Sequence, residues 1–242
     1  WSILERLGRF DGSSNLPYPT VNPEADRCMQ VFDVLAAAYP RACDPQEFFS
    51  SPFQVLVLTI LSAQTTDAQV WALRGPLFQA YPSPEALAEA DPSDLEAVIR
   101  PTGYFRAKAR HLLGASRLLV DEYGGEVPAT MEDLVRLPGV GRKTANIVLF
   151  HAFGRNEGIA VDTHVLRLAQ RLGLSCHVDP VRVERDLMAG LPRARWGPFT
   201  DLLIAHGRAV CTARRPHCDV CLLSGLCRHA REARPPLPPG TG

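Results

Sequence analysis

The stretch Leu137-Pro-Gly-Val-Gly-Arg-Lys-Thr-Ala-Asn146 has the composition of a tight hairpin between two helices. Pro138 cannot continue a preceding helix because it lacks the amide hydrogen and its ring clashes with the previous turn. Gly139 and Gly141 permit the positive-φ backbone that such a turn needs. We therefore predict that one helix ends before the proline and that a second helix begins at about Arg142.

The start of this second helix is suited to binding an anion. Its first backbone N–H groups have no partner within the helix, and they carry the positive end of the helix dipole. Glycines without side chains would let a DNA phosphate approach the backbone closely. An ordinary corner between two helices explains the same residues, so the hairpin alone leaves both interpretations open.

Lys143 favours the functional interpretation. It falls in the first turn of the helix, where the dipole disfavours an ammonium ion and favours the free amine that a covalent nucleophile requires. Lys108 is the only other lysine of the chain, which otherwise uses arginine for positive charge. Because arginine cannot deprotonate and form a Schiff base, imine chemistry has these two lysines and the chain's amino terminus to choose from.

Asp162 directly precedes a segment with the pattern of another helix, beginning at about Thr163. Its carboxylate can cap that helix, and capping alone explains the residue. Bonds from helix N–H groups also keep a carboxylate ionised, and an ionised carboxylate can stabilise a developing cation. The capping and catalytic interpretations are therefore compatible.

Four of the seven cysteines are crowded into one pattern, Cys211-x6-Cys218-x2-Cys221-x5-Cys227. Such crowding predicts a metal site rather than disulfides. Four thiolates could hold zinc or an iron–sulfur cluster, and ligand softness does not distinguish the two. The other three cysteines have no clustered partner, and we expect them to be buried thiols. They are Cys28, Cys43 and Cys176.

The charge of the chain is balanced but unevenly distributed. The 242 residues have a formal net charge of zero, which by itself argues against a nucleic-acid-binding protein. Residues 1–60 carry four arginines against seven acids, whereas residues 193–234 carry eight arginines against three acids. This asymmetry predicts a basic surface that can attract a polyanion, although solvated arginines alone would give the same pattern.

Nothing in the composition suggests a membrane protein. The hydrophobic fraction of 46% is ordinary for a folded domain, and the longest apolar run, residues 55–61, is too short to span a bilayer. No basic-then-apolar signal segment opens the chain. We expect a cytoplasmic protein if the source is bacterial, associated with the nucleoid through DNA, and without membrane contact.

Proline and glycine punctuate the chain into many short helical segments, which predicts an all-α fold. The run 158–161 could form a strand but has no convincing partner. Residues 101–108 faintly echo the hairpin, with a glycine followed by a basic helix. Further helices are expected to begin after Pro23, at Pro52, at Thr66 or Asp67, at Asp91, at Pro180 and at Pro198.

The hairpin sequence, followed by Val161-Asp-Thr-His-Val165, closely resembles the endonuclease III family of helix-hairpin-helix DNA glycosylases. The resemblance runs from about Pro23 to Cys227 and includes Cys-Thr-Ala-Arg-Arg-Pro from Cys211 onward. It implies that the four clustered cysteines hold a [4Fe–4S] cluster rather than zinc. It also implies that Lys143 attacks the sugar of a damaged nucleotide, with assistance from Asp162.

The resemblance further implies two helical domains. A six-helix barrel containing the helix-hairpin-helix would span residues 45–155, and an iron–sulfur domain would combine residues 23–44 with 156–234. Lys143 and Asp162 would then face DNA from different domains. Residues 1–22 are expected to be a flexible extension, and residues 235–242 a disordered tail.

Several residues would contact DNA if the resemblance holds. Gln64 matches the glutamine that fills the hole left by a flipped nucleotide, although it could be an ordinary polar turn residue. Tyr104 occupies the position of an apolar wedge, often leucine in relatives, and could instead be a core aromatic. The remaining expected contacts are Gly139, Gly141, Arg142, Thr144, Arg214 and Arg215.

The function implied is base excision repair. A monomer would remove oxidised pyrimidines from double-stranded DNA and would cut the resulting abasic site by β-elimination through a lysine Schiff base. One alternative is a glycosylase that prefers uracil or mismatched thymine. Another is a DNA-binding damage sensor that has lost catalysis, although the presence of both Lys143 and Asp162 argues against it.

Overall fold

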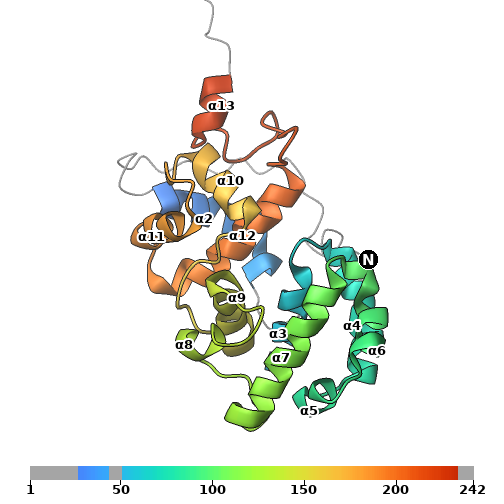
Figure 1. Ribbon diagram of the computed structural model, residues 1–242. Coiled ribbons are helices and arrows are strands. Elements are labelled where there is room, and N and C mark those ends of the chain that lie inside the picture. Colours follow the sequence, from blue (N-terminus) through green and yellow to red (C-terminus); the bar gives the residue numbers. More distant parts are fainter. Residues whose placement is uncertain (1–26, 44–50, 234–242) are drawn as a thin grey trace, which may run out of the picture. The chain divides into compact units, whose positions relative to one another are not determined.

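The structure, a computed structural model, describes residues 27–43 and 51–233, and these are folded into helices joined by turns and loops (Figure 1). No strand occurs in those two ranges, so the all-α prediction is confirmed and residues 158–161 are not a strand. The expectations for residues 1–22 and 235–242 lie outside the described residues. The described chain forms two compact units, one of residues 51–160 and one that joins residues 27–43 to 161–233.

The first unit contains both long helices and short ones. In chain order they are α3 (Pro52–Ser62), α4 (Asp67–Ala80), α5 (Pro84–Ala88), α6 (Pro92–Ile99), the 3-10 turn η2 (Arg100–Thr102), α7 (Phe105–Tyr123), α8 (Met131–Leu134) and α9 (Arg142–Phe153).

Helix α3 forms the centre of the first unit. Ser51 caps it by accepting a hydrogen bond from the Gln54 amide at 3.3 Å, and Pro52 occupies the first helical position, where a missing amide hydrogen costs nothing. Its side chains from Phe53 to Leu61 are buried apart from Gln54 and Thr59. Helices α4, α7 and α9 pack against α3, so the apolar sequence of this helix is explained by partners on several sides.

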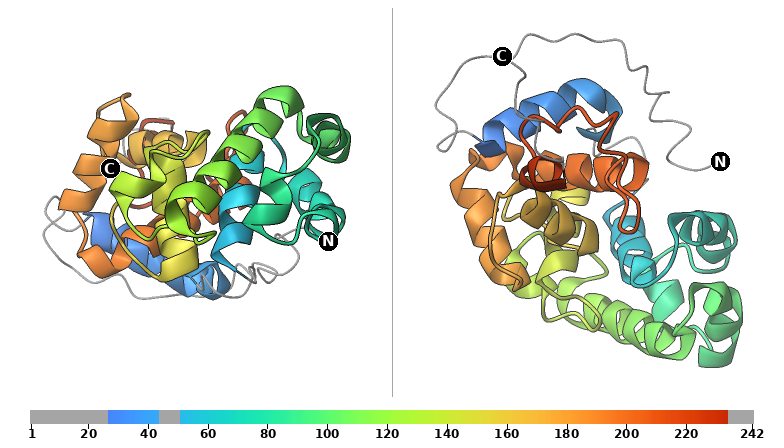
Figure 2. Two further views of the ribbon diagram at one scale, coloured as in Figure 1. Left: turned by 60° about the horizontal axis from the view of Figure 1, so that its bottom comes forward. Right: turned by 90° about the horizontal axis from the view of Figure 1, so that it is seen from above.

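The second unit is assembled from both ends of the described chain. Its helices are α2 (Arg27–Ala38), the 3-10 turns η1 (Pro40–Cys43) and η3 (Arg193–Arg195), α10 (Thr163–Leu172), α11 (Pro180–Ala189), α12 (Trp196–Ala209) and α13 (Arg228–Ala233). Helix α12 packs against both α2 and α10, and Figure 2 shows α2 (blue) beside α12 (orange). Phe199 of α12 is fully buried, and its ring lies 6.2 Å from that of Phe32 in α2.

One helix boundary differs from the sequence-based expectations, and one helix was not expected. Helix α12 begins at Trp196, two residues before Pro198, because proline is tolerated in a first turn. Helix α5 was not predicted, although Ser83 caps it and Pro84 follows, which is the same signal that starts α3 and α6. None of the described helices is long and apolar enough to cross a membrane.

Candidate active site

The hairpin between α8 and α9 has the predicted boundaries. Helix α8 ends at Leu134 and α9 begins at Arg142, while Leu137 and Val140 of the connecting turn are buried. Gly139 has φ +82°, and a Cβ atom added there would lie only 2.8 Å from the Cβ of His111. Both its backbone conformation and its surroundings therefore require glycine.

Gly141 corrects the expectation that both glycines adopt positive φ. Its φ is −94° and its ψ is 177°, which is extended backbone open to other residues. A Cβ atom added there would meet nothing within 4 Å. Neither conformation nor packing within the described chain explains why this residue is glycine.

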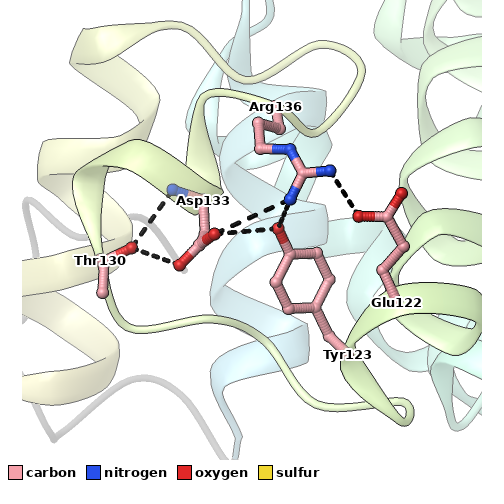
Figure 3. Close-up of polar contacts among 5 residues, drawn as sticks. All are labelled: Glu122, Tyr123, Thr130, Asp133 and Arg136. Carbon is pink, nitrogen blue, oxygen red and sulfur yellow. Dashed lines mark hydrogen bonds and ion pairs between the residues drawn. The ribbon is translucent and has the colours of Figure 1, made fainter.

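A polar network fixes the first helix of the hairpin to the end of α7 (Figure 3). The Tyr123 hydroxyl donates to Asp133 Oδ1 at 3.1 Å and accepts from Arg136 Nη1 at 2.8 Å, while Arg136 also pairs with Glu122. Thr130 caps α8 and donates to Asp133 Oδ2 at 2.6 Å. Helix α8 is a single turn and too short to be stable alone, so these contacts hold the hairpin in place.

The N-terminus of α9 presents the predicted nucleophile. Gly141 occupies the N-cap position and has no side chain to accept from the first amides. Arg142 and Lys143 are exposed in the first turn, and Thr144 is half-buried. This arrangement leaves a basic helix start accessible to an anion.

Lys108 is in a very different environment. Its side chain is 5% exposed, and Nζ donates to the Leu61 carbonyl at 2.9 Å, the Thr65 hydroxyl at 2.6 Å and the Thr102 carbonyl at 2.9 Å. Burial lowers the pKa of this lysine. All three donors of the ammonium group are occupied, so Lys108 is placed as a structural residue and not as a nucleophile.

Gln64 and Tyr104 share an unusual backbone conformation. Their φ angles are +52° and +46°, and they are the non-glycine residues with positive φ in the described chain. Both side chains are exposed, Tyr104 to 71%. The exposure rules out the alternative that Tyr104 is a core aromatic.

In the second unit, Asp162 caps α10 as predicted. Its Oδ1 accepts from the amides of His164 and Val165, both at 2.8 Å, and its Oδ2 lies 3.1 Å from His164 Nδ1. The side chain is 15% exposed. The bonds from the two backbone amides fix the orientation of the carboxylate.

The four clustered cysteines line one pocket of the second unit. Apolar side chains, including Leu168, Leu172 and Val210, complete its walls. No group of three or more possible ligands in residues 27–43 and 51–233 has the spacing of a site for a single metal ion. Four thiol sulfurs in a pocket with apolar walls are a donor set that fits a [4Fe–4S] cluster, in which each cysteine binds a different iron.

Two arginines of α10 hold the loop that begins at Cys211. Arg167 donates to the carbonyls of Cys211 and Gly207, at 3.1 to 3.2 Å. Arg171 donates to the carbonyls of Thr212 and Ala213, both at 2.8 Å, and to Cys211 Sγ at 3.3 Å. Arg214 and Arg215 are exposed on this braced loop.

The isolated cysteines do not share one environment. Cys176 is exposed, which contradicts the prediction that it is a buried thiol, because it lies in the loop after α10 rather than in a helix core. Cys28 is half-buried, and burial raises the pKa of its thiol to about 11. The side chain of Cys43 lies outside the described residues.

Comparison with known families defines the class of the protein. Residues 57–193 match the HhH-GPD superfamily of base excision DNA repair proteins, and residues 211–227 match the iron-sulfur binding domain of endonuclease III. The first match covers more than half of the chain and includes both Lys143 and Asp162. The second match includes the four clustered cysteines.

Individual relatives narrow the class. Endonuclease III of Synechocystis sp. is 50% identical over 85% of this chain and 93% of its own length, and that of Bacillus subtilis is 41% identical over 83% and 91%. A solved structure of a trapped endonuclease III–DNA covalent intermediate superposes with a TM-score of 0.80 at 38% identity, covering 88% of this chain and 99% of that chain. A thermostable thymine-DNA glycosylase, at 23% identity and a TM-score of 0.76, shares the fold.

The chain belongs to the endonuclease III family. It is a base excision repair DNA glycosylase with activity as a lyase at apurinic and apyrimidinic sites, and removal of oxidised pyrimidines is the role of the family. Its cofactor is a [4Fe–4S] cluster. The predictions of family, enzyme class and cofactor are confirmed.

Proposed function

We propose that this chain excises oxidised pyrimidines from duplex DNA with Lys143 as the nucleophile. The environment of Lys108 carries this assignment. Its ammonium is buried and has three hydrogen-bond acceptors, whereas Lys143 is exposed at the start of α9. Lys143 is therefore the lysine amine that can reach a nucleotide.

In this proposal the free amine of Lys143 attacks C1′ of a nucleotide flipped from the duplex. The glycosidic bond breaks and its electron pair leaves with the base. The sugar ring then opens to give a protonated Schiff base, which acidifies the C2′ proton. Loss of that proton expels the 3′ phosphate by β-elimination, so the strand is cut on the 3′ side of the lesion.

Asp162 would supply the negative charge that this reaction needs. Its carboxylate is held by two backbone amides and does not require reorganisation when positive charge develops on the sugar. It would also help to remove the proton from the Lys143 ammonium. The [4Fe–4S] cluster would be held by Cys211, Cys218, Cys221 and Cys227, and its structural contribution would be to close the loop that carries Arg214 and Arg215.

Duplex DNA would be bound by three groups of residues. The turn and first helical residues of the hairpin, namely Gly139, Gly141, Arg142 and Thr144, would bind a phosphate. Gln64 and Tyr104 would occupy the space left by the flipped nucleotide, and Arg214 and Arg215 would contact phosphates.

We also propose the domain organisation and physical state that accompany this function. A helix-hairpin-helix barrel would span residues 45–155, and the cluster domain would combine residues 23–44 and 156–234. The protein would act as a monomer, in the cytoplasm of a bacterial cell. The solved structures of relatives with DNA support duplex DNA as the partner.

Borohydride trapping tests the nucleophile. Borohydride reduces a Schiff base to a stable amine, so wild-type protein should form a covalent adduct with duplex containing an oxidised pyrimidine, and Lys143→Gln should form none. Adducts should be fewer with uracil or mismatched thymine in the same duplex. Equal trapping by Lys143→Gln would move the nucleophile to Lys108 or the amino terminus, and a preference for uracil would favour the alternative substrate class.

The salt dependence of DNA binding tests the cluster loop. Arg214→Ala should weaken binding at all sequences and should reduce the slope of log K against log salt concentration by about 1, because one phosphate contact is lost. Fluorescence anisotropy over a salt series measures this slope. Arg182→Ala, an exposed arginine on α11, serves as the matched control. An unchanged slope for Arg214→Ala would remove the loop from the interface.

A further inference from the structure

Lys108 is buried in the first unit without a carboxylate among the acceptors of its hydrogen bonds. Two backbone carbonyls and one hydroxyl receive its three donors at 2.6 to 2.9 Å. Removing an ammonium ion from water is unfavourable, and neutral acceptors compensate for that cost less well than a carboxylate does. A lysine at this position therefore calls for an explanation beyond core stability.

The three acceptors come from two stretches of the chain. Leu61 lies at the end of α3, Thr65 lies in the loop between α3 and α4, and Thr102 ends the turn η2 before α7. The Thr65 hydroxyl also donates to the Thr102 carbonyl at 2.6 Å. The ammonium group and this hydroxyl thus join two loops that are 37 residues apart in the sequence.

Each joined loop carries one of the two non-glycine residues of the described chain that have positive φ. Gln64 directly precedes Thr65, and Tyr104 follows Thr102 by two residues. A left-handed conformation is unfavourable for side chains such as these, and it persists where the surrounding structure determines it. The hydrogen bonds of Lys108 to Thr65 and Thr102 lie within two residues of both.

We propose that Lys108 is a positioning residue, which fixes the two loops so that Gln64 and Tyr104 enter the duplex together when a nucleotide is flipped out. A lysine suits this role because one ammonium presents three donors from a single point at the end of a long chain. The inference rests on the proposed DNA contacts of Gln64 and Tyr104. It adds a residue that touches neither the sugar nor the base.

The test compares two substrates. In duplex DNA the space left by the flipped nucleotide has to be filled, whereas single-stranded DNA has no such space. Lys108→Met keeps the length of the side chain and removes its donors. It should lower excision of an oxidised pyrimidine from duplex DNA by about tenfold to a hundredfold, the effect of a small misplacement of positioned groups. Cleavage of a preformed abasic site in single-stranded DNA should change less than about twofold, since no opposite strand has to be held apart.

A fluorescent base reports on gap filling without chemistry. 2-Aminopurine placed opposite an abasic site brightens when it is unstacked, so wild-type protein should increase its fluorescence and Lys108→Met should lose most of that increase. A melting temperature and a cluster absorbance equal to those of the wild type would show that the variant is folded. An equal loss on both substrates, or no loss on either, would overturn the proposal.

Two further sets of variants keep the outcome decisive. Thr65→Val retains Lys108 and removes the bridging hydroxyl, so it should give a several-fold loss confined to duplex DNA even if Lys108→Met does not fold. Full duplex activity in Thr65→Val would also overturn the proposal. Gln64→Ala and Tyr104→Ala should reproduce the loss of fluorescence. If Gln64→Ala and Tyr104→Ala keep the fluorescence increase, the proposed DNA contacts of these two residues are wrong. If only Lys108→Met keeps the increase, the DNA contacts stand and the positioning role of Lys108 is refuted.

Discussion

The helices α9 and α10 begin in opposite ways. Helix α9 follows Gly141, which has no side chain to cap the first turn, and Lys143 adds a cation where the helix dipole disfavours one. Helix α10 follows Asp162, whose carboxylate accepts from two amides of its first turn. The start of α9 is less stable for lack of a cap, and its first amides remain accessible. The start of α10 has two of its amides hydrogen-bonded, and the cap fixes the position of a negative charge.

The difference is informative because side-chain caps are common in this molecule. Five other helices of the described chain begin with a side chain that accepts from the first turn. The capping residues are Ser51 for α3, Ser83 for α5, Asp91 for α6, Thr130 for α8 and Asp179 for α11. Helices α4, α7 and α12 also begin without a side-chain cap, and α9 differs from them in following a glycine, which leaves the amides of its first turn open to a phosphate.

The largest expected effect comes from substitutions of Asp162 that distinguish its role as the cap of α10 from the role of its negative charge. Asp162→Asn keeps a good capping side chain, so thermal stability should change by less than about 0.5 kcal/mol, yet base excision should slow by about a hundredfold because the charge is lost. Asp162→Ala should slow excision similarly and should cost about 1 kcal/mol of stability as well. Single-turnover kinetics and thermal melting measure the two quantities.

If Asp162→Asn excised bases at the wild-type rate, the carboxylate would be a helix cap and nothing more. The start of α9 would then remain a candidate DNA-binding site, and the start of α10 would be an ordinary capped helix without a catalytic role.

A smaller effect distinguishes the two glycines of the hairpin. Gly139→Ala should destabilise the free protein by roughly 1–3 kcal/mol, because φ is +82° and the new Cβ would meet His111. Gly141→Ala should change stability by less than about 1 kcal/mol, since its φ suits alanine and the space is empty, while alanine is a poorer N-cap residue than glycine. It should weaken duplex binding by about tenfold, because a methyl group would keep a phosphate from the backbone.

Denaturant unfolding and anisotropy titrations of both variants would show whether this separation holds. If Gly141→Ala bound duplex DNA with wild-type affinity, the start of α9 would be accessible but would not contact a DNA phosphate.

The smallest expected effect concerns the capped start of α8, the first helix of the hairpin. The hydrogen bond from Thr130, together with that from Tyr123, holds the pKa of Asp133 below its ordinary value. The stabilisation from ionised Asp133 is therefore present above pH 3.8, the ordinary value, and is lost as pH falls through the lower folded pKa.

Thr130→Val removes the largest cause of this shift, so its stability should decline less between pH 4 and pH 2 than that of the wild type. Urea unfolding at several pH values measures the difference. Parallel pH curves for the two proteins would contradict the assigned cause.

Local sequence signals predicted much of this molecule. The Ser-Pro and Asp-Pro pairs placed the starts of α3 and α6, the apolar run after Pro52 predicted a buried helix, and the hairpin sequence placed the start of α9 at Arg142. These features depend on a few neighbouring residues. The same is true of the cap at Asp162, which the structure confirms.

Features that depend on contacts distant in the sequence could not be predicted in this way. Lys108 was an open candidate for the nucleophile, and its burial follows from carbonyls and a hydroxyl contributed by α3 and two loops. The exposure of Cys176 depends on how the loop after α10 lies. Gly141 resembles Gly139 in the sequence, yet its φ is −94° where that of Gly139 is +82°, and a Cβ atom added to it would meet nothing within 4 Å.

The empty space beside Gly141 has a consequence for interpreting natural variation in this protein. Small substitutions at this position would be tolerated by folding, so the altered protein would accumulate normally and would pass any screen based on abundance or solubility. If Gly141 binds a phosphate as proposed, the damage would appear in the genome of the cell instead, as unrepaired lesions and a raised mutation rate.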